Sequence, residues 1–203
     1  QLVEQSLKKM RAGGIYDHIG FGFHRYATDR DWKIPHFEKM LYDQAQLILL
    51  YTDAYAATRK YEYRRTAEEI VQFTTAELSS SAGAFFSALD AESEGQEGLF
   101  YLWTYDELSK LLKENEQDVL PLFNVKPDGN WRDPVSGQEE TTNILYADTL
   151  DSAQYPVENW ESVRRKLYKY RELRIPPGTD DKILTSWNGM MIRALARAAG
   201  TKT

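Results

Sequence analysis

The chain has 203 residues, no cysteine and a formal net charge of −6. This length can bury a core in one domain, and the absence of thiols from the chain excludes disulfides and zinc–cysteine sites within it. Lysine and arginine are interleaved with acids, which argues against nucleic acid as a partner. No apolar run approaches the roughly 20 residues that span a bilayer, and the N-terminus lacks a signal-peptide core. We therefore expect a cytoplasmic protein with no membrane partner and a small polar ligand.

Three stretches have the apolar pattern of amphipathic helices, which expose one face to solvent; we call them one-sided helices. They cover residues 2–11, 64–78 and 158–173. In the first stretch, Val3, Leu7 and Met10 form one apolar stripe, while Glu4 and Lys8 lie on the other side. Residues three and four apart share a helix face, so each of these helices should pack on one side and keep the other in solvent.

Two further stretches are apolar nearly all round. Residues 37–57 and 187–199 carry Leu, Ile, Met and Ala on every face, with Arg193 and Arg197 as a narrow polar stripe in the second. A helix of this kind is surrounded by protein. We predict that helices at about 37–57 and 185–199 are far more buried than the other three.

The one-sided and all-round-apolar helices alternate along the chain, which favours two concentric rings of helices. The predicted fold class is all-α, part of an (α/α)6 toroid, with small β-hairpins in the loops. A plain up-down bundle would give every helix a wet face and fits less well. The chain starts at Gln1 within a helical pattern and ends directly after another helix, so residues 1–203 are expected to form an incomplete toroid domain, a fragment of a larger protein.

Three long loops follow the one-sided helices and should cluster at one end of the ring. The first is predicted to form a strand over residues 18–26, which turns at 28–31 into a second strand at 32–34. The second should pair the aromatic residues before Asp90 with residues 99–103 in a hairpin. Thr104 and Glu107 then form a capping box for the next helix.

Four residues of these loops are candidate catalytic groups. Histidine titrates near neutral pH, and a nearby carboxylate can orient it and assist proton transfer. The candidates are His24, His36, Glu38 and Asp90. The alternative interpretation is a hydrogen-bonded structural network that ties the first loop to the helices.

Seven more residues are candidates for substrate binding, because aromatic rings can stack on a sugar and polar groups can bond its hydroxyls. They are Tyr26, Trp32, Asp43, Glu92, Lys182, Trp187 and Asn188. In a chain with 13% aromatic residues, the aromatic members can equally be core or loop anchors.

We predict no metal and no cofactor. Asp90, Glu92, Glu94 and Gly95 match the start of a calcium loop, but its twelfth position is Tyr101 instead of a bidentate glutamate. The sequence contains no P-loop, dinucleotide fingerprint, HExxH or GxSxG motif, so the reactions that depend on these motifs have no support.

Three long strings carry a resemblance to a known family. They are GGIYDHIGFGFHRYATDRDWKIPHFEKMLYDQAQL, FFSALDAESEGQEGLFYLW and KILTSWNGMMIRALARAA. They resemble the YyaL-like, spermatogenesis-associated thioredoxin-domain-containing family, and the match touches nearly the whole chain. The resemblance implies a thioredoxin-like domain before this chain and a six-hairpin α/α toroid related in fold to N-acylglucosamine 2-epimerases and six-hairpin glycosidases. The expected partners are therefore the rest of the toroid and the thioredoxin-like domain.

The family has three consecutive glycines where this chain reads Gly20-Phe21-Gly22, so the local turn should differ here. The resemblance assigns no catalytic residue, and the link to sugars rests on fold analogy.

Two functions remain open from the sequence. In the first, the domain acts on a carbohydrate or similar polyol by acid–base chemistry of the epimerase or glycosidase type. In the second, it is a non-catalytic ligand- or protein-binding scaffold. An active site requires the candidate residues to converge on one open cavity.

Overall fold

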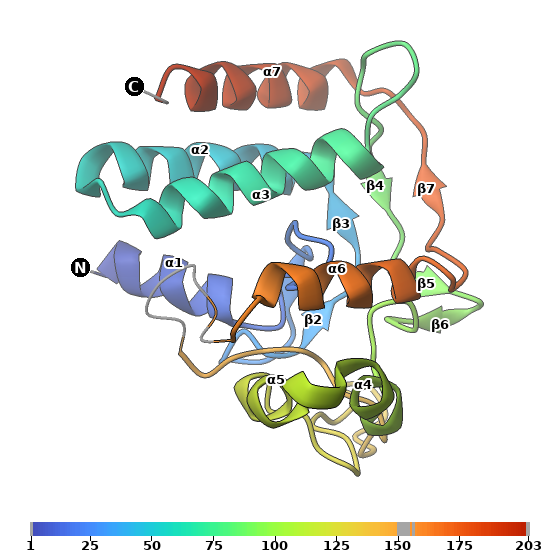
Figure 1. The fold of residues 1–203 in the computed structure, drawn as a ribbon. Helices are drawn as coiled ribbons and strands as arrows, with labels where there is room; N and C mark the ends of the chain where they lie inside the picture. The colour runs from blue at the N-terminus through green and yellow to red at the C-terminus, as the bar shows by residue number, and fades with distance from the viewer. Residues whose placement is uncertain (1, 150–154, 156, 202–203) are drawn as a thin grey trace.

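The computed structural model describes residues 2–149, 155 and 157–201. It is mostly helical, with small antiparallel sheets (Figure 1). Gln1, Lys202 and Thr203, which belong to the expectation of a fragment, lie outside the described residues. That expectation remains a prediction.

The helices agree with the predicted stretches to within a few residues at their ends. The α-helices are α1 (Leu2–Ala12), α2 (Leu41–Thr58), α3 (Tyr61–Glu77), α4 (Tyr105–Leu112), α5 (Glu116–Leu122), α6 (Trp160–Arg171) and α7 (Thr185–Ala199). The strands are β1 (Tyr26–Ala27), β2 (Pro35–His36), β3 (Lys39–Met40), β4 (Ala88–Leu89), β5 (Glu92–Ser93), β6 (Gln96–Glu97) and β7 (Thr179–Asp180). The predicted capping box is confirmed, because Thr104 and Glu107 bond each other's backbone at the start of α4.

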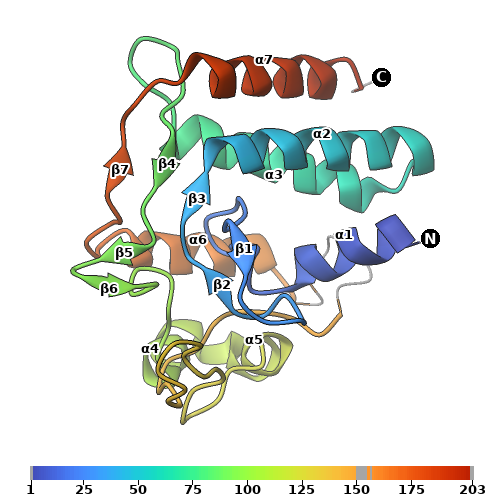
Figure 2. The same cartoon turned by 180° about the vertical axis from the view of Figure 1, so that it is seen from behind.

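The helices are stacked in layers, and each runs in one of two opposite directions. In Figure 1, α7 lies above the pair formed by α2 and α3, with α1 and α6 below and α4 and α5 at the bottom. Helices α2 and α7 run in one direction, and α1, α3 and α6 run in the opposite one (Figures 1 and 2). The three long loops consequently emerge at the same end, as the sequence predicted.

A small sheet joins these three loops. Strand β3 from the first loop pairs with β4 from the second, and β4 pairs with β7 from the third, all antiparallel. The register places Lys39 opposite Leu89 and Leu89 opposite Thr179. Segments far apart in the sequence therefore meet in one sheet beside the beginnings of α2 and α7.

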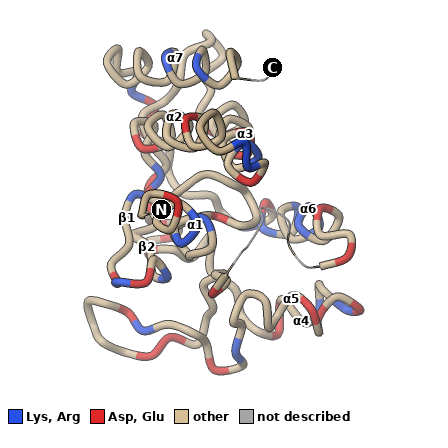
Figure 3. The backbone as a smooth tube through the Cα atoms, turned by 90° about the vertical axis from the view of Figure 1, so that its left-hand side faces the viewer, with Lys and Arg blue, Asp and Glu red and all other residues tan. Residues whose placement is uncertain are grey.

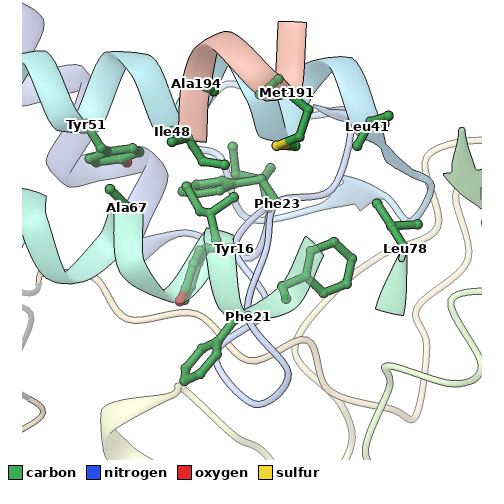
Figure 4. Close-up of a cluster of buried hydrophobic side chains, with 14 of the residues drawn as sticks. Tyr16, Phe21, Phe23, Leu41, Ile48, Tyr51, Ala67, Leu78, Met191 and Ala194 are labelled. Carbon is green, nitrogen blue, oxygen red and sulfur yellow. The ribbon is translucent and has the colours of Figure 1, made fainter. Parts of the chain in front are cut away.

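The largest apolar core lies between α2, α3, α7 and the first loop. Figure 4 shows Ile48 of α2 and Met191 of α7 beside Phe23 of the loop. All three side chains are fully buried. Burying a side chain of this size contributes about 1.5–3 kcal/mol, so this core attaches the first loop firmly to the helices.

The predicted contrast in burial between the two sets of helices is wrong. In α7 only Met191 and Ala194 are buried, whereas the one-sided helix α3 buries seven residues. The reason is that α7 packs through one face on α2, and Ile192 on its far side is 65% exposed. Burial therefore does not distinguish inner from outer helices in this chain.

Both predicted hairpins pair differently in the structure. In the first loop, Tyr26 pairs with His36, and Tyr16 forms a separate bridge with Phe23. In the second loop, the hairpin is β5–β6, and the aromatic run at 99–103 does not pair with β4. Glu94 and Gly95 both have positive φ, as the two central residues of a type I′ turn require. The glycine that suggested a calcium loop thus has a turn role.

Two adjacent glycines at the end of α1 allow a close backbone approach. A Cβ atom on Gly13 would lie 2.3 Å from the carbonyl oxygen of Trp32, and one on Gly14 would lie 2.0 Å from that of Lys33. Any larger residue at either position would push the β1–β2 loop away from α1.

Candidate functional site

Strand β3 and the residue before it send neighbouring side chains to opposite sides, as an extended chain must. The side chain of Lys39 is 1% exposed and faces the core, while that of Glu38 is 24% exposed. Continuing the register of β3 and β4 by one pair places Glu38 opposite Asp90. Two predicted catalytic carboxylates therefore directly adjoin the paired strands β3 and β4 at the loop end.

His36 is held between three side chains. Its ring stacks on Tyr26, with centroids 4.9 Å apart. Its Nδ1 lies 2.8 Å from Oε1 of Glu97, and its Nε2 lies 3.6 Å from Oε2 of Glu38. The structure thus brings together the predicted residues His36, Tyr26 and Glu38. It adds Glu97, which the sequence analysis did not select.

Arg25 connects this group to the start of α2. Its Nη1 donates to Oε2 of Glu38 at 2.9 Å, and its Nε donates to the hydroxyl of Tyr42 at 3.0 Å. Tyr42 in turn meets Trp187 edge to face, with ring centroids 4.8 Å apart. The predicted Trp187 therefore lies at the border of the same group.

Asp43, on the first turn of α2, has an incompletely satisfied carboxylate. Its Oδ2 is buried and has no hydrogen-bond partner in the part of the chain that the structure describes. The pKa of Asp43 is raised to about 6, mainly by burial; the charge of Arg25 opposes this rise and that of Glu38 adds to it. A carboxyl group that titrates near neutral pH can hold and release a proton under physiological conditions.

We call this group the loop-end cluster. Its members are Arg25, Tyr26, His36, Glu38, Tyr42, Asp43, Glu97 and Trp187. Five of them were predicted from the sequence, and Arg25, Tyr42 and Glu97 connect those five.

His24 lies elsewhere, in the protein interior. It is 3% exposed, its Nδ1 is 2.9 Å from the carbonyl oxygen of Phe37, and Phe37 and Tyr101 meet its ring edge to face. Burial, aided by the charge of Lys39, lowers the pKa of His24 to about 3. The ring is therefore neutral at physiological pH and fits the structural alternative.

Two other predicted ligand residues are engaged in holding the chain together. Asn188 accepts a hydrogen bond from the amide of Phe85 at 2.8 Å and donates to the carbonyl of Phe85 at 3.0 Å. Trp32 packs against the core with a left-handed backbone, φ 64°. Both residues hold loops in place.

The remaining predicted residues are exposed around the sheet. Lys182 forms an ion pair with Asp180 at 2.9 Å. Glu92 lies in β5 opposite Glu97, and Asp90 accepts a hydrogen bond from the amide of Glu92. Their roles in ligand binding remain predictions.

A buried ionic centre lies directly behind the loop-end cluster. Asp17 accepts two hydrogen bonds from Arg171, both at 2.9 Å, and one from Lys39 at 2.8 Å. All three side chains are at most 4% exposed. Burial alone would raise the pKa of Asp17, but Arg171 and Lys39 outweigh it and hold that pKa well below its usual range.

A second buried network connects α1 with α3. Glu69 accepts hydrogen bonds from Arg11 at 2.8 Å and from the hydroxyl of Tyr16 at 2.7 Å. Arg11 also donates to Tyr155, whose hydroxyl lies 2.8 Å from Nδ1 of His18. The sequence analysis missed both networks. For the Asp17 centre, the available signal was that Arg171 lies on the apolar stripe of α6 with Trp160, Val163 and Leu167.

Charges of both signs are distributed along the elements. Figure 3 shows acidic and basic positions interspersed from α1 to α6, whereas α7 carries only the basic Arg193 and Arg197. Among the described residues, no helix has the combination of length and apolarity that a membrane span needs.

The coordinates thus define a mostly helical protein whose loops bring acidic and aromatic side chains to one end of its helices. No protein-family model matches the chain. The chain is 39% identical to mouse spermatogenesis-associated protein 20 and 36% identical to the human protein, in each case over 97% of its length. It is also 33% identical to an uncharacterized protein of Caenorhabditis elegans.

The chain is therefore homologous to the spermatogenesis-associated protein 20 family over nearly its whole length. It spans 28% of the length of the mouse, rat and human proteins and 31% of the nematode protein.

Proposed function

We propose that the loop-end cluster binds a neutral polyol, such as a sugar, and acts on it by acid–base chemistry of the epimerase or glycosidase type. The observation that carries this proposal is the convergence of three separate loops in the β3–β4–β7 sheet. Beside this sheet, the first loop and the start of α2 carry His36, Glu38, Asp43 and the ring of Tyr26, and α7 adds the ring of Trp187. Aromatic faces suit the apolar face of a sugar ring, and acceptors suit its hydroxyls.

Two groups of the cluster could exchange protons in such a reaction. The raised pKa of Asp43 keeps a fraction of this carboxyl protonated near neutral pH, as a general acid requires. The imidazole of His36 is partly exposed and can serve as a base. An acid and a base in different environments on one surface are the minimum for proton transfer at a carbon or a glycosidic oxygen.

We further propose that the helices belong to an α/α toroid, in which α2 and α7 are neighbouring inner helices. Their common direction, opposite to that of α1, α3 and α6, supports this arrangement. An apolar hollow of about 440 Å³ lies between α2, α3 and α7, and Ala67, Val71 and Leu195 line it. Further helices of the natural protein would cover this hollow and the exposed side of α7. A structure of the full-length protein without helices there would contradict the toroid.

Binding by the natural full-length protein tests the proposed function. Neutral sugars, polyols and sugar phosphates would be titrated against the wild type and the variants His36→Asn and Glu38→Gln. We expect a neutral sugar to bind, and each variant to weaken binding about tenfold or more, because His36→Asn removes the imidazole and Glu38→Gln replaces a charged acceptor by a weaker, neutral one. The matched control is Asp53→Asn, on the exposed side of α2 far from the cluster.

The outcomes separate the two functions left open by the sequence. If no probe binds, or if the cluster variants bind as the wild type does, the loop-end cluster is not a sugar site. The non-catalytic scaffold is then favoured. If a sugar binds and turnover is found, unchanged rates in both folded variants would remove His36 and Glu38 from the mechanism.

A further inference from the structure

Glu97 makes two contacts with the segment that carries His36. Its Oε1 lies 2.8 Å from Nδ1 of His36 and accepts a hydrogen bond from the amide of Phe37 at 3.2 Å. A second contact to the backbone next to the ring fixes the carboxylate relative to that ring. The Glu97 carboxylate is therefore more than a mobile surface charge.

The fold places Glu97 there through the residue that follows it. Gly98 has φ +75°, and a Cβ atom on it would lie 2.5 Å from Cε2 of Phe37. Only glycine allows the end of the β5–β6 hairpin to lie against the Phe37 ring in this conformation. The tight turn at Glu94 and Gly95 sets the register that pairs Glu97 with Glu92.

This contact determines which nitrogen of the neutral His36 ring carries the proton. An ionised carboxylate can only accept hydrogen bonds, so Nδ1 of His36 must donate to Glu97. In the neutral imidazole the other nitrogen, Nε2, then has a free lone pair. Stacking on Tyr26, with an interplanar angle of 25°, keeps the ring from turning away.

The free nitrogen has a second acceptor as its neighbour. Nε2 lies 3.6 Å from Oε2 of Glu38, which is longer than a hydrogen bond. Two acceptors at this separation do not satisfy each other. Oε2 of Glu38 accepts from Nη1 of Arg25, whereas Nε2 of the Nδ1–H tautomer still needs a donor. A hydroxyl or an ammonium group of a ligand that lies within reach of both atoms can donate to Nε2 and contact Glu38.

We propose that Glu97 is a positioning residue that holds His36 as the Nδ1–H tautomer, so that Nε2 and Glu38 form an acceptor pair for a donor group of the ligand. This inference rests on the proposed function for its ligand. The ligand class it selects is a neutral polyol or a cationic amine, and phosphate or carboxylate groups lack the donor that the pair needs.

The tautomer can be measured in the ligand-free, full-length protein by nitrogen-15 NMR of labelled histidine. The signals of His36 are assigned by their loss in His36→Asn. In the wild type, with the ring neutral, we expect the Nδ1–H form to dominate, although a free imidazole in water favours Nε2–H. Glu97→Ala should return His36 to the Nε2–H form, and Glu97→Gln should retain Nδ1–H because its amide oxygen still accepts. A wild type in the Nε2–H form, or an unchanged tautomer in Glu97→Ala, would overturn the proposal.

A binding experiment tests the ligand. Sorbitol and its amine analogue glucamine are the probes, and sorbitol 6-phosphate is included because it adds an anionic phosphate. We expect Glu97→Ala to weaken sorbitol binding about tenfold and Glu97→Gln to change it less than about threefold. If neither probe binds the wild type while the tautomer is as expected, the proposed function fails and the positioning role stands. Equal binding by wild type and Glu97→Ala would refute the acceptor pair.

Discussion

Glu38 and Lys39 are adjacent in the chain, yet they belong to two polar groups that are satisfied to different extents. In the buried ionic centre, Asp17 is bonded by Arg171 and Lys39 and also accepts the amides of Ile19 and Gly20. In the loop-end cluster, Asp43 has a buried oxygen without a partner among the described residues, and Nε2 of His36 lies 3.6 Å from Oε2 of Glu38, beyond hydrogen-bond distance. The carboxylate of Asp17 is fully satisfied, although Nε of Arg171 in the same centre has no partner among the described residues. Satisfied polar groups stabilise a fold. Polar groups that still lack partners can bind something else.

The largest change in the free energy of unfolding is expected from disrupting the buried ionic centre. Asp17→Asn leaves Lys39 and Arg171 buried without their counter-charge, and breaking a buried ion pair in this way costs about 3–5 kcal/mol. The free energy of unfolding, measured by urea denaturation of the full-length protein, should fall by that amount. A loss below about 1 kcal/mol would mean that solvent reaches the centre.

A smaller loss of stability is expected from a substitution where the β5–β6 hairpin contacts the loop-end cluster. Gly98→Ala introduces a Cβ atom that would overlap the Phe37 ring at a positive φ, so we expect a loss of about 2 kcal/mol. The same change should move Glu97 away from His36 and alter the His36 tautomer. If stability falls but the tautomer is unchanged, the hairpin does not position Glu97.

Asp43→Asn should raise the free energy of unfolding, whereas the two preceding variants lower it. The folded-state pKa of Asp43 is raised to about 6, above its ordinary value of 3.8, so stability falls as pH rises from 3.8 to about 6, and the full loss is present above 6. We expect the variant to be more stable than the wild type by about 1 kcal/mol at pH 7.5, allowing for the partial exposure of the group. The difference should vanish below about pH 4, where Asp43 is protonated in both states. Thermal unfolding at both pH values gives the comparison, and a variant less stable at pH 7.5 would contradict it.

The smallest effect is expected at an exposed ion pair between α2 and α7. Asp53 accepts from Arg197 at 2.8 Å, but both side chains are at least half exposed. Asp53→Asn should change the free energy of unfolding by less than about 0.5 kcal/mol, and high salt should remove even that change. A larger effect would show that this contact, unlike other surface pairs, holds α7 on α2.

The helices and the meeting of the loops were predictable from the sequence, but strand pairing and buried charge were not. Periodicity identifies helices because it depends on residues near one another, whereas the partner of β4 lies in segments distant in the chain. The sequence analysis singled out neither Lys39 nor Glu69, and both are buried. In an extended chain, residues two apart point to the same side. Phe37 is an apolar residue that points inward, so the same alternation would have placed Lys39 inside.

The β3–β4–β7 sheet has a consequence for the order of folding. Its strands come from three distant segments and have two residues each, so they contribute few contacts in return for closing long loops. Helices α2 and α3, joined by a short turn, can form their contacts early. The sheet, and with it the arrangement of Glu38 and Asp90, should form last and open first in native-state hydrogen exchange. A newly made chain would therefore gain its helical core before it gains the surface proposed to bind a ligand.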